Sequence, residues 1–503
     1  MLKWNDRFPF VFFAIILVFI FLAGDGIRIA QYPPRSFHMF RQSDCLAYTK
    51  TYYQHKTVFF APATYNLIGK DGRVVSEFPV LYYLSAQLCK LLGFHYWIIR
   101  GVTFLCYFFG AFCLLLITKR WIRNPVLAYF PVIILATAPF YFYYAVNFLP
   151  NVPAISFSFI GLYFLLRFTD NSRTYNLSLG TLFFVVAALL KPTDGGLIWA
   201  AMTGVLTFSI FTKVGIDVKV KPVLISCLSV ILVSAGWYYF VKQYNLRYGN
   251  TINLQGIYPI WDMIWGDVLY VYNERIMGIW RDTFQHPVLL LISGGCLISF
   301  CVKWNRLDRF LRLFTLFLLV GTLVYIPLWY KAFSDHDYYQ LIFVIPAFFL
   351  SVTMIEYYER CIVDRISKET RYTINIVLVA LMIICVYHNQ FIQLGKYSDN
   401  IRNYGNVNIH EVEPYLRKFG VTEDDIVLSV PDGTPNITLA AYGNRGFASD
   451  LFEKGLFNVE YCRQRGAHYM IITDASYIYD SAYVAYTSKL VGQYKDIYVF
   501  DIR

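Results

Sequence analysis

The chain has 503 residues and a formal net charge of +11, and 57% of its residues are hydrophobic whereas only 15% are charged. Soluble domains carry about 25% charged residues, so this composition excludes an ordinary soluble enzyme. An aromatic content of 19% excludes a disordered chain. The composition therefore predicts a polytopic α-helical membrane protein with a smaller polar part.

In a soluble protein, the excess of positive charge would indicate a nucleic-acid partner. Here the Lys and Arg residues form short clusters between apolar runs, a pattern typical of cytoplasmic loops in membrane proteins. We therefore expect no nucleic-acid partner. The ten Cys residues are scattered and lack the spacing of a metal finger or a disulfide framework.

Apolar stretches that could cross a bilayer as helices, roughly 17–25 residues long, recur along most of the chain. About eleven are candidates, and they lie near 8–23, 97–118, 126–145, 152–168, 177–191, 194–212, 222–241, 287–303, 310–330, 341–356 and 373–388. The first lacks a signal-peptide cleavage site, so we expect it to be retained. Basic residues cluster in every second connection, which predicts a cytoplasmic N-terminus and an extracytoplasmic C-terminal part, in the cytoplasmic (inner) membrane.

Two polar segments of the expected outer side have a pattern of their own. The first outer loop, 24–96, contains two segments with helical spacing, CLAYTKTYYQH and FPVLYYLSAQLCKLL, which we expect to lie along the membrane interface. In the tail, strand-like segments such as DIVLSV and HYMIITD alternate with helical ones. We therefore expect a transmembrane domain over 1–388 and an extracytoplasmic α/β domain over 389–503.

Charged residues are almost absent from the middle of the candidate spans and gather at their outer ends. The densest cluster combines Arg41, Asp44 and Glu77 in the first outer loop. Taken alone, Asp44 could simply cap the helix that follows it. Two carboxylates beside an Arg could instead deprotonate and orient a hydroxyl, or hold a divalent cation.

A second cluster lies in the segment KAFSDHDYYQ, which contains Lys331, His336, Asp337 and Tyr339. Lys191 lies at the outer end of the fifth candidate span, where it could bind an anion or only extend its amine to the interface. Together, these side chains could hold a lipid phosphate. If a metal ion binds, its candidate ligands are Glu77, His336 and Asp337.

The ordered motifs RQSD, SEFPVLYYL, KP and HDYYQL resemble those of the GT-C membrane glycosyltransferases. The most similar group is the bacterial branch of the dolichyl-phosphate-mannose–protein mannosyltransferase superfamily, which includes the aminoarabinose transferase of lipid A. This resemblance implies a polyprenyl-phosphate-linked sugar as donor. It also implies inverting transfer to a hydroxyl of a lipid-linked glycan, a lipid or a protein.

The resemblance also suggests roles for individual residues. Asp44 falls on the position of the family's catalytic base, and Glu77 falls on its second acidic position. The groups that would bind the donor phosphate are Arg41, Lys191, Lys331, His336 and Tyr339. Many relatives carry two adjacent acids in the first loop, but Asp44 is followed by Cys45. No cofactor is therefore certain, and a divalent metal ion stays an open possibility.

Three other functions fit parts of the pattern. An O-antigen ligase or polymerase would place its main basic residues in a large late outer loop. This chain instead has its earliest acids in the first outer loop and ends in a separate domain. A lipid-glycan transporter or flippase would need a continuous hydrophilic groove through the spans, and the sequence offers little material for one. A non-catalytic scaffold would bind lipid and glycan without turnover.

Overall fold

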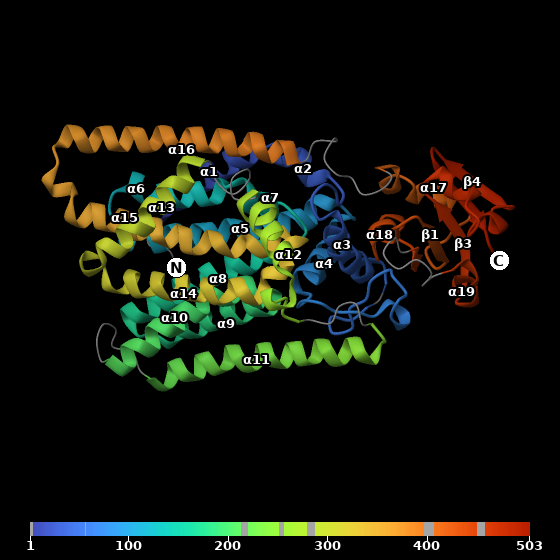
Figure 1. The fold of residues 1–503 in the computed structure, drawn as a ribbon, viewed down its shortest axis with the longest axis horizontal. Helices are drawn as coiled ribbons and strands as arrows, with labels where there is room; N and C mark the ends of the chain where they lie inside the picture. The colour runs from blue at the N-terminus through green and yellow to red at the C-terminus, as the bar shows by residue number, and fades with distance from the viewer. Residues whose placement is uncertain are drawn as a thin grey trace. The chain divides into compact units, whose positions relative to one another are not determined.

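Helices make up most of the computed structural model, which describes residues 4–55, 57–212, 220–250, 256–278, 287–396, 407–449 and 458–503 (Figure 1). In these ranges, seven helices are long and apolar enough to cross a membrane, and an eighth span is formed if a bent helix pair counts as one. Those seven are α5 (Tyr96–Thr118), α8 (Asn151–Asn171), α10 (Pro192–Thr212), α11 (Val220–Arg247), α14 (Arg309–Trp329), α15 (Val344–Cys361) and α16 (Lys368–Lys396).

The remaining candidate stretches also contain helices, but these are shorter, bent or only partly described. They are α1 (Trp4–Ala23), α9 (Thr174–Leu190), α13 (Pro287–Val302) and the pair formed by α6 (Pro125–Thr137) and α7 (Pro139–Ala145). The pair bends by 68°. Pro139 explains the break, because the residue before a proline is forced out of the helical conformation. The predicted polytopic helical fold is confirmed.

Contacts divide the chain into two compact units. The first unit comprises Met1–Ile29, Thr103–Trp237 and Gly256–Gly395, and it contains most of the apolar helices. In it, α8 packs against α9 and α10, and α10 packs against α14. The second unit comprises Ala30–Val102, Tyr238–Gln255 and Lys396–Arg503. The first polar loop and the tail, which are far apart in sequence, therefore belong to one unit.

The tail contains a five-stranded sheet with the order β2-β1-β3-β5-β4. Its strands are β1 (Ile426–Val430), β2 (Gly446–Ala448), β3 (Ala467–Ile472), β4 (Leu490–Tyr494) and β5 (Ile497–Asp501). The strands β2, β1 and β3 are parallel, whereas β5 pairs antiparallel with both β3 and β4. Buried side chains such as Leu428, Met470 and Phe500 form the core of this sheet. The predicted small α/β domain is confirmed.

Short helices accompany the sheet and the first loop. In the tail they are α17 (Glu413–Lys418), α18 (Ile437–Tyr442) and α19 (Val459–Gln464). In the first loop, α3 (Met39–Gln54) packs against α4 (Val80–Leu92), and α18 also packs against α3. Both loop helices were expected from their spacing. The segment DLFEKGLFNVEYCRQRG also has helical spacing, and α19 lies within it, whereas its residues 450–457 lie outside the described part of the chain.

Candidate functional site

The RQSD segment forms part of one turn of α3. The helix begins at Met39, directly after His38, which adopts the left-handed backbone conformation with a φ of 53°. Asp44 therefore lies inside the helix, and the interpretation of Asp44 as its N-terminal cap is wrong. Arg41 and Asp44 are separated by three positions, which places them on the same face of the helix. A distance of 3.5 Å separates Arg41 Nη1 from Asp44 Oδ2.

Glu77 holds the Arg41 side chain in place. The Nη2 atom of Arg41 lies 2.5 Å from one carboxylate oxygen of Glu77 and 2.6 Å from the other. Ser76 Oγ and the Tyr82 hydroxyl also donate hydrogen bonds to Glu77. With 5% of its side chain exposed, Glu77 is a buried carboxylate whose two oxygens are already engaged. The three residues predicted from the first loop are thus brought together.

Asp44 has a partner from the tail that was not predicted from the sequence. Asn436 Nδ2 donates a hydrogen bond of 2.8 Å to Asp44 Oδ1. The backbone N–H of Asn66 donates to Asn436 Oδ1 over 3.3 Å, which orients the amide so that its nitrogen points to the carboxylate. Asn436 precedes α18 without a side-chain capping bond to that helix, so its amide is available for this contact.

The DGTPN segment that carries Asn436 is fixed by Asp432. This carboxylate accepts hydrogen bonds from the backbone and hydroxyl of Thr434, each over 2.9 Å, and from both groups of Thr438. Burial raises the pKa of Asp432, although these four hydrogen bonds act to lower it. Asp, Gly and Pro, which this segment contains, are residues typical of turns. The turn can be predicted from the sequence, but the contact of Asn436 with the first loop cannot.

Electrostatics at Asp44 suit a group that exchanges a proton. Burial raises the pKa of Asp44, and Glu77 raises it further, against the lowering effects of Arg41 and the Asn436 hydrogen bond. Burial alone would lower the pKa of Arg41, but Glu77 and its other neighbours raise it well above its usual value, so the guanidinium stays charged. Burial also raises the pKa of the neighbouring Cys45 thiol to about 12, which makes it a poor nucleophile.

A second group of predicted residues comes together in the first unit. The Lys191 ammonium lies 4.6 Å from the ring centre of Tyr339 and 5.4 Å from that of Tyr338. His336 stacks on Tyr338 with 5.3 Å between ring centres. The Tyr144 hydroxyl donates to Asp337. A cation held over aromatic rings keeps its charge available to an anion.

The turn after Lys191 contains a buried acid that the sequence reasoning missed. Asp194 is fully buried in the first turn of α10 and accepts a hydrogen bond from Asn151 Nδ2 over 2.5 Å. The turn is tight, since a Cβ on Gly195 would lie 2.5 Å from the Ala187 carbonyl oxygen. Asp194 thus lies three positions after Lys191, in the turn that follows it.

Lys331 differs from the other predicted phosphate ligands. Its backbone N–H donates to the Tyr258 carbonyl over 3.0 Å, but its side chain is exposed and makes no hydrogen bond or ion pair with any described residue. The structure therefore gathers Lys191, His336 and Tyr339 and leaves Lys331 at the surface.

The predicted metal ligands do not form a metal site. Across the part of the chain that the structure describes, no group of three or more His, Cys, Asp or Glu side chains is placed to hold an ion. Both Glu77 oxygens accept hydrogen bonds from protein groups, and Asp337 accepts one from Tyr144. This donor set does not fit a metal ion.

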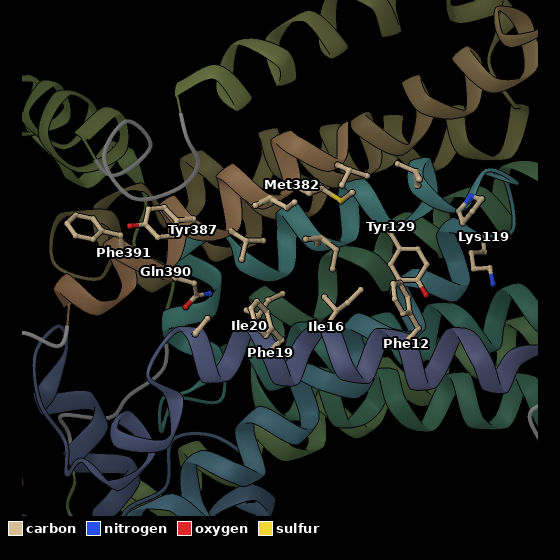
Figure 2. A pocket seen from close by; sticks show the side chains of 17 residues that line it. Phe12, Ile16, Phe19, Ile20, Lys119, Tyr129, Met382, Tyr387, Gln390 and Phe391 are labelled. Atoms are coloured by element: carbon tan, nitrogen blue, oxygen red, sulfur yellow. The ribbon is translucent and has the colours of Figure 1, made fainter. Parts of the chain in front are cut away.

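The first unit also contains a long apolar groove between α1, α6 and α16, with a volume of about 890 Å³ (Figure 2). Aliphatic and aromatic side chains such as Ile16, Phe19 and Met382 line it. Lys119 and Gln390 are its polar lining residues at opposite ends. Gln390 is 4% exposed, and its amide has no hydrogen-bond partner among the described residues. Such a groove suits a lipid chain.

One known protein family is similar to part of this chain. A family model described as "Dolichyl-phosphate-mannose-protein mannosyltransferase" matches residues 76–239, about a third of the chain, which include Glu77 and Lys191. By sequence, no curated protein matches the chain at a significant level.

Solved structures match over much more of the chain. ArnT from Cupriavidus metallidurans in the apo state has a TM-score of 0.64 and 12% identity, covering 100% of this chain and 99% of its own. The oligosaccharyltransferase AglB from Archaeoglobus fulgidus has a TM-score of 0.54 and 12% identity, covering 93% of this chain and 70% of its own. The mycobacterial arabinofuranosyltransferase AftD has a TM-score of 0.52 and 12% identity, covering 98% of this chain and 40% of its own.

At 12% identity these matches establish the fold. The resemblance predicted from the motifs is confirmed: the chain is a multispan membrane protein with the GT-C fold, similar to ArnT and, over residues 76–239, to the dolichyl-phosphate-mannose–protein mannosyltransferases.

Proposed function

We propose that the protein is a glycosyltransferase that moves a sugar from a polyprenyl-phosphate carrier to an acceptor hydroxyl with inversion. The observation that carries the proposal is the Asp44 carboxylate, which has a raised pKa, lies beside Arg41 and accepts a hydrogen bond from Asn436. The similar structures support a lipid-phosphate donor in general terms, since ArnT was also solved with undecaprenyl phosphate and AglB with dolichol phosphate.

Of the two acids, Asp44 is better placed to be the base. Its side chain is 24% exposed, compared with 5% for Glu77. Glu77 already accepts hydrogen bonds from Arg41, Ser76 and Tyr82, whereas among the described residues Asp44 Oδ2 has only the 3.5 Å contact with Arg41. We assign proton removal to Asp44. Glu77 is then a positioning residue, because it holds the guanidinium that favours the ionised form of Asp44.

The reaction needs little more than a base and a group that binds phosphate. The acceptor oxygen attacks the sugar's anomeric carbon from the face opposite the phosphate, and the carbon–oxygen bond to the lipid phosphate breaks. Asp44 takes the hydroxyl proton, and polyprenyl phosphate leaves with the bonding electron pair. Since phosphate is a good leaving group, catalysis depends on orientation of the hydroxyl and on stabilisation of developing charge.

For the phosphate we propose Lys191, together with His336 and Tyr339 beside it. The amine is held over Tyr339, and the buried Asp194 fixes the turn that carries it. A lysine binds phosphate as a point charge and does not need the planar geometry of arginine. Arg41 is a second candidate because Glu77 engages only its Nη2 atom. Lys331, which is exposed, would attract the anionic donor from a distance.

Two further features agree with a membrane-bound donor. The groove between α1 and α16 could accommodate part of a prenyl chain (Figure 2). Alternation of basic connections supports an active site outside the cytoplasm, at the cytoplasmic membrane. The acceptor would then be a lipid-linked glycan, a lipid or a protein on that side.

The proposal is tested by incubating the purified protein with a panel of polyprenyl-phosphate sugars and measuring release of free polyprenyl phosphate. We expect one donor to react when membrane extract supplies the acceptor. The Asp44→Asn variant should insert and fold but release almost none. If no donor reacts, or if Asp44→Asn reacts normally, the proposed function or the assigned base is wrong.

A further inference from the structure

A polar cavity of about 350 Å³ lies in the second unit, apart from the residues around Asp44. It forms where the loop from Leu67 to Asp71 meets the start of β1 and of β2. Both the first polar loop and the tail therefore contribute to its wall. Cavities of this size, at the small end of the ~300–1,000 Å³ range of ligand sites, hold small molecules or parts of larger ones.

The backbone around the cavity is firmly fixed. The Leu67 N–H donates to the Gly446 carbonyl over 2.9 Å, and the Gly446 N–H donates to the Tyr65 carbonyl over 3.0 Å. Only glycine fits between the two segments, because a Cβ on Gly446 would lie 1.9 Å from the Val427 carbonyl oxygen. The Lys70 N–H also bonds to the Tyr248 carbonyl. The first loop thus extends the edge of the sheet at β2, and hydrogen bonds hold the backbone on this side of the cavity.

Charges of both signs line the cavity in equal number. Three are cations and three are carboxylates: Lys70, Arg445, Arg465, Asp71, Glu423 and Asp424. All six residues are described by the structure, and they form no ion pair with one another. Their hydrogen-bonding groups are therefore available to a molecule in the cavity.

Two buried polar atoms of residues that line the cavity are also available to a bound molecule. Nε2 of His55 and Nε of Arg445 have no hydrogen-bond partner in the described part of the chain. Burial and the nearby Arg445 lower the pKa of His55, so its ring is neutral at pH 7. A buried polar group without a partner costs free energy that a ligand's hydroxyl could recover.

The composition of the wall restricts the chemistry of its ligand. With three charges of each sign, the wall has no net charge and favours neither an anion nor a cation. An apolar molecule would leave all of these groups unsatisfied. A neutral molecule rich in hydroxyls can accept from the cations and donate to the carboxylates at once. Leu67, Ile426 and Phe447 add apolar surface for the face of a ring.

We propose that this cavity binds a neutral sugar unit of a glycan acceptor. The inference rests on the proposed transferase function and narrows its acceptor from a lipid, protein or glycan to a molecule that carries a glycan. A sugar held here would anchor the acceptor through the second unit, to which the base Asp44 and its partner Asn436 also belong.

The test measures binding of a panel of neutral di- and trisaccharides to the full-length protein in detergent by saturation-transfer NMR, without any donor. At least one should bind, and both Arg445→Ala and Asp424→Asn should weaken it by about tenfold or more. The matched control is Arg463→Ala, which removes an exposed arginine on neighbouring α19 that pairs with Glu460. This control should bind as well as the unmodified protein.

Absence of binding by every neutral saccharide would overturn the inference, and so would equal binding by the Arg445 and Asp424 variants. Displacement of the saccharide by millimolar inorganic phosphate would also overturn it, because an anion site would then be present. Saccharide binding in a protein that releases no polyprenyl phosphate from any donor would support the cavity assignment and count against the proposed transferase. The two proposals are therefore separable.

Discussion

Asn436 donates a 2.8 Å hydrogen bond to Asp44 from a position 392 residues later in the chain. This contact joins the short turn before α18 to the first-loop helix α3. A second contact between the same regions is the ion pair of Lys50 with Glu413, at 3.0 Å. The tail is thus more than an appended domain, because it completes the surroundings of the carboxylate that we assign as the base.

Replacement of Asp44 by Asn should abolish most of the activity. Loss of a general base lowers rates by about 10²- to 10⁴-fold, and the amide keeps the size of the side chain and its contact with Asn436. The readout is the rate of polyprenyl phosphate release. Asp170→Asn, which alters an exposed carboxylate paired with Arg120, is the matched control and should retain full activity. A rate within twofold of the unmodified protein would remove Asp44 from the chemistry.

Replacement of Asn436 by Ala should change the pH dependence of the reaction. The Asn436 hydrogen bond lowers the pKa of Asp44, which burial has already raised, so its loss should raise that pKa further. The base must be ionised to act, and activity falls as the pH drops through its pKa. We therefore expect the acidic limb of kcat/KM to move upward by about one pH unit, with activity recovered at higher pH.

The control for this shift is Asn408→Ala, which alters a half-buried tail residue that bonds to Asp496. Its pH profile should match that of the unmodified protein. A uniform loss of activity in Asn436→Ala at every pH, with no movement of the acidic limb, would indicate a purely structural role for Asn436.

Sequence reasoning was sufficient for the fold because hydropathy and strand patterns are local properties. Each apolar stretch contains a helix or a bent pair, and the strands β1, β3 and β5 were visible as short apolar runs. The strands β2 and β4 were missed. Strand β2 has only three residues, and the side chains of β4 are exposed or half-buried, as in a loop.

The site was only partly predictable. Arg41, Asp44 and Glu77 stood out because charged residues are rare in this chain, and the structure brings them together. Nothing in the sequence around Asn436 indicates its contact with Asp44, because that contact depends on packing between segments that are distant in the chain. The prediction that Asp44 caps the helix was wrong because the helix begins earlier, at Met39. His38, which directly precedes the helix, adopts the left-handed backbone conformation. That backbone conformation is uncommon for a non-glycine residue.

Lys191→Met should impair use of the donor. Removal of the ammonium leaves the aromatic pair Tyr338 and Tyr339 without a charge for the phosphate, so we expect KM for the donor to rise by about tenfold or more. Lys191→Arg should retain part of the function, because it keeps the charge. The exposed Lys331→Met is the comparison variant, and its smaller effect should disappear at high salt. An unchanged donor KM in Lys191→Met would mean that this amine only extends to the membrane interface.

Glu413→Ala should destabilise the protein through Lys50. The Lys50 side chain is 4% exposed and that of Glu413 is 30% exposed, so loss of the carboxylate leaves a nearly buried ammonium without its ion-pair partner. Burial lowers the pKa of Lys50 while Glu413 raises it, which shows that the carboxylate supports the charged form. Loss of one partner from a buried pair costs about 3 kcal/mol, so the midpoint of thermal unfolding should fall by several degrees. The double variant Lys50→Met with Glu413→Ala should regain much of this loss, since no unpaired charge is then buried.

Glu411→Ala is the control, because it removes a carboxylate that pairs with the exposed Lys495 and should leave the midpoint of thermal unfolding unchanged. If Glu413→Ala unfolds at the same temperature as the Glu411 control, the contact between α3 and α17 contributes nothing to stability, and the tail is held to the first loop by its backbone pairing at Gly446.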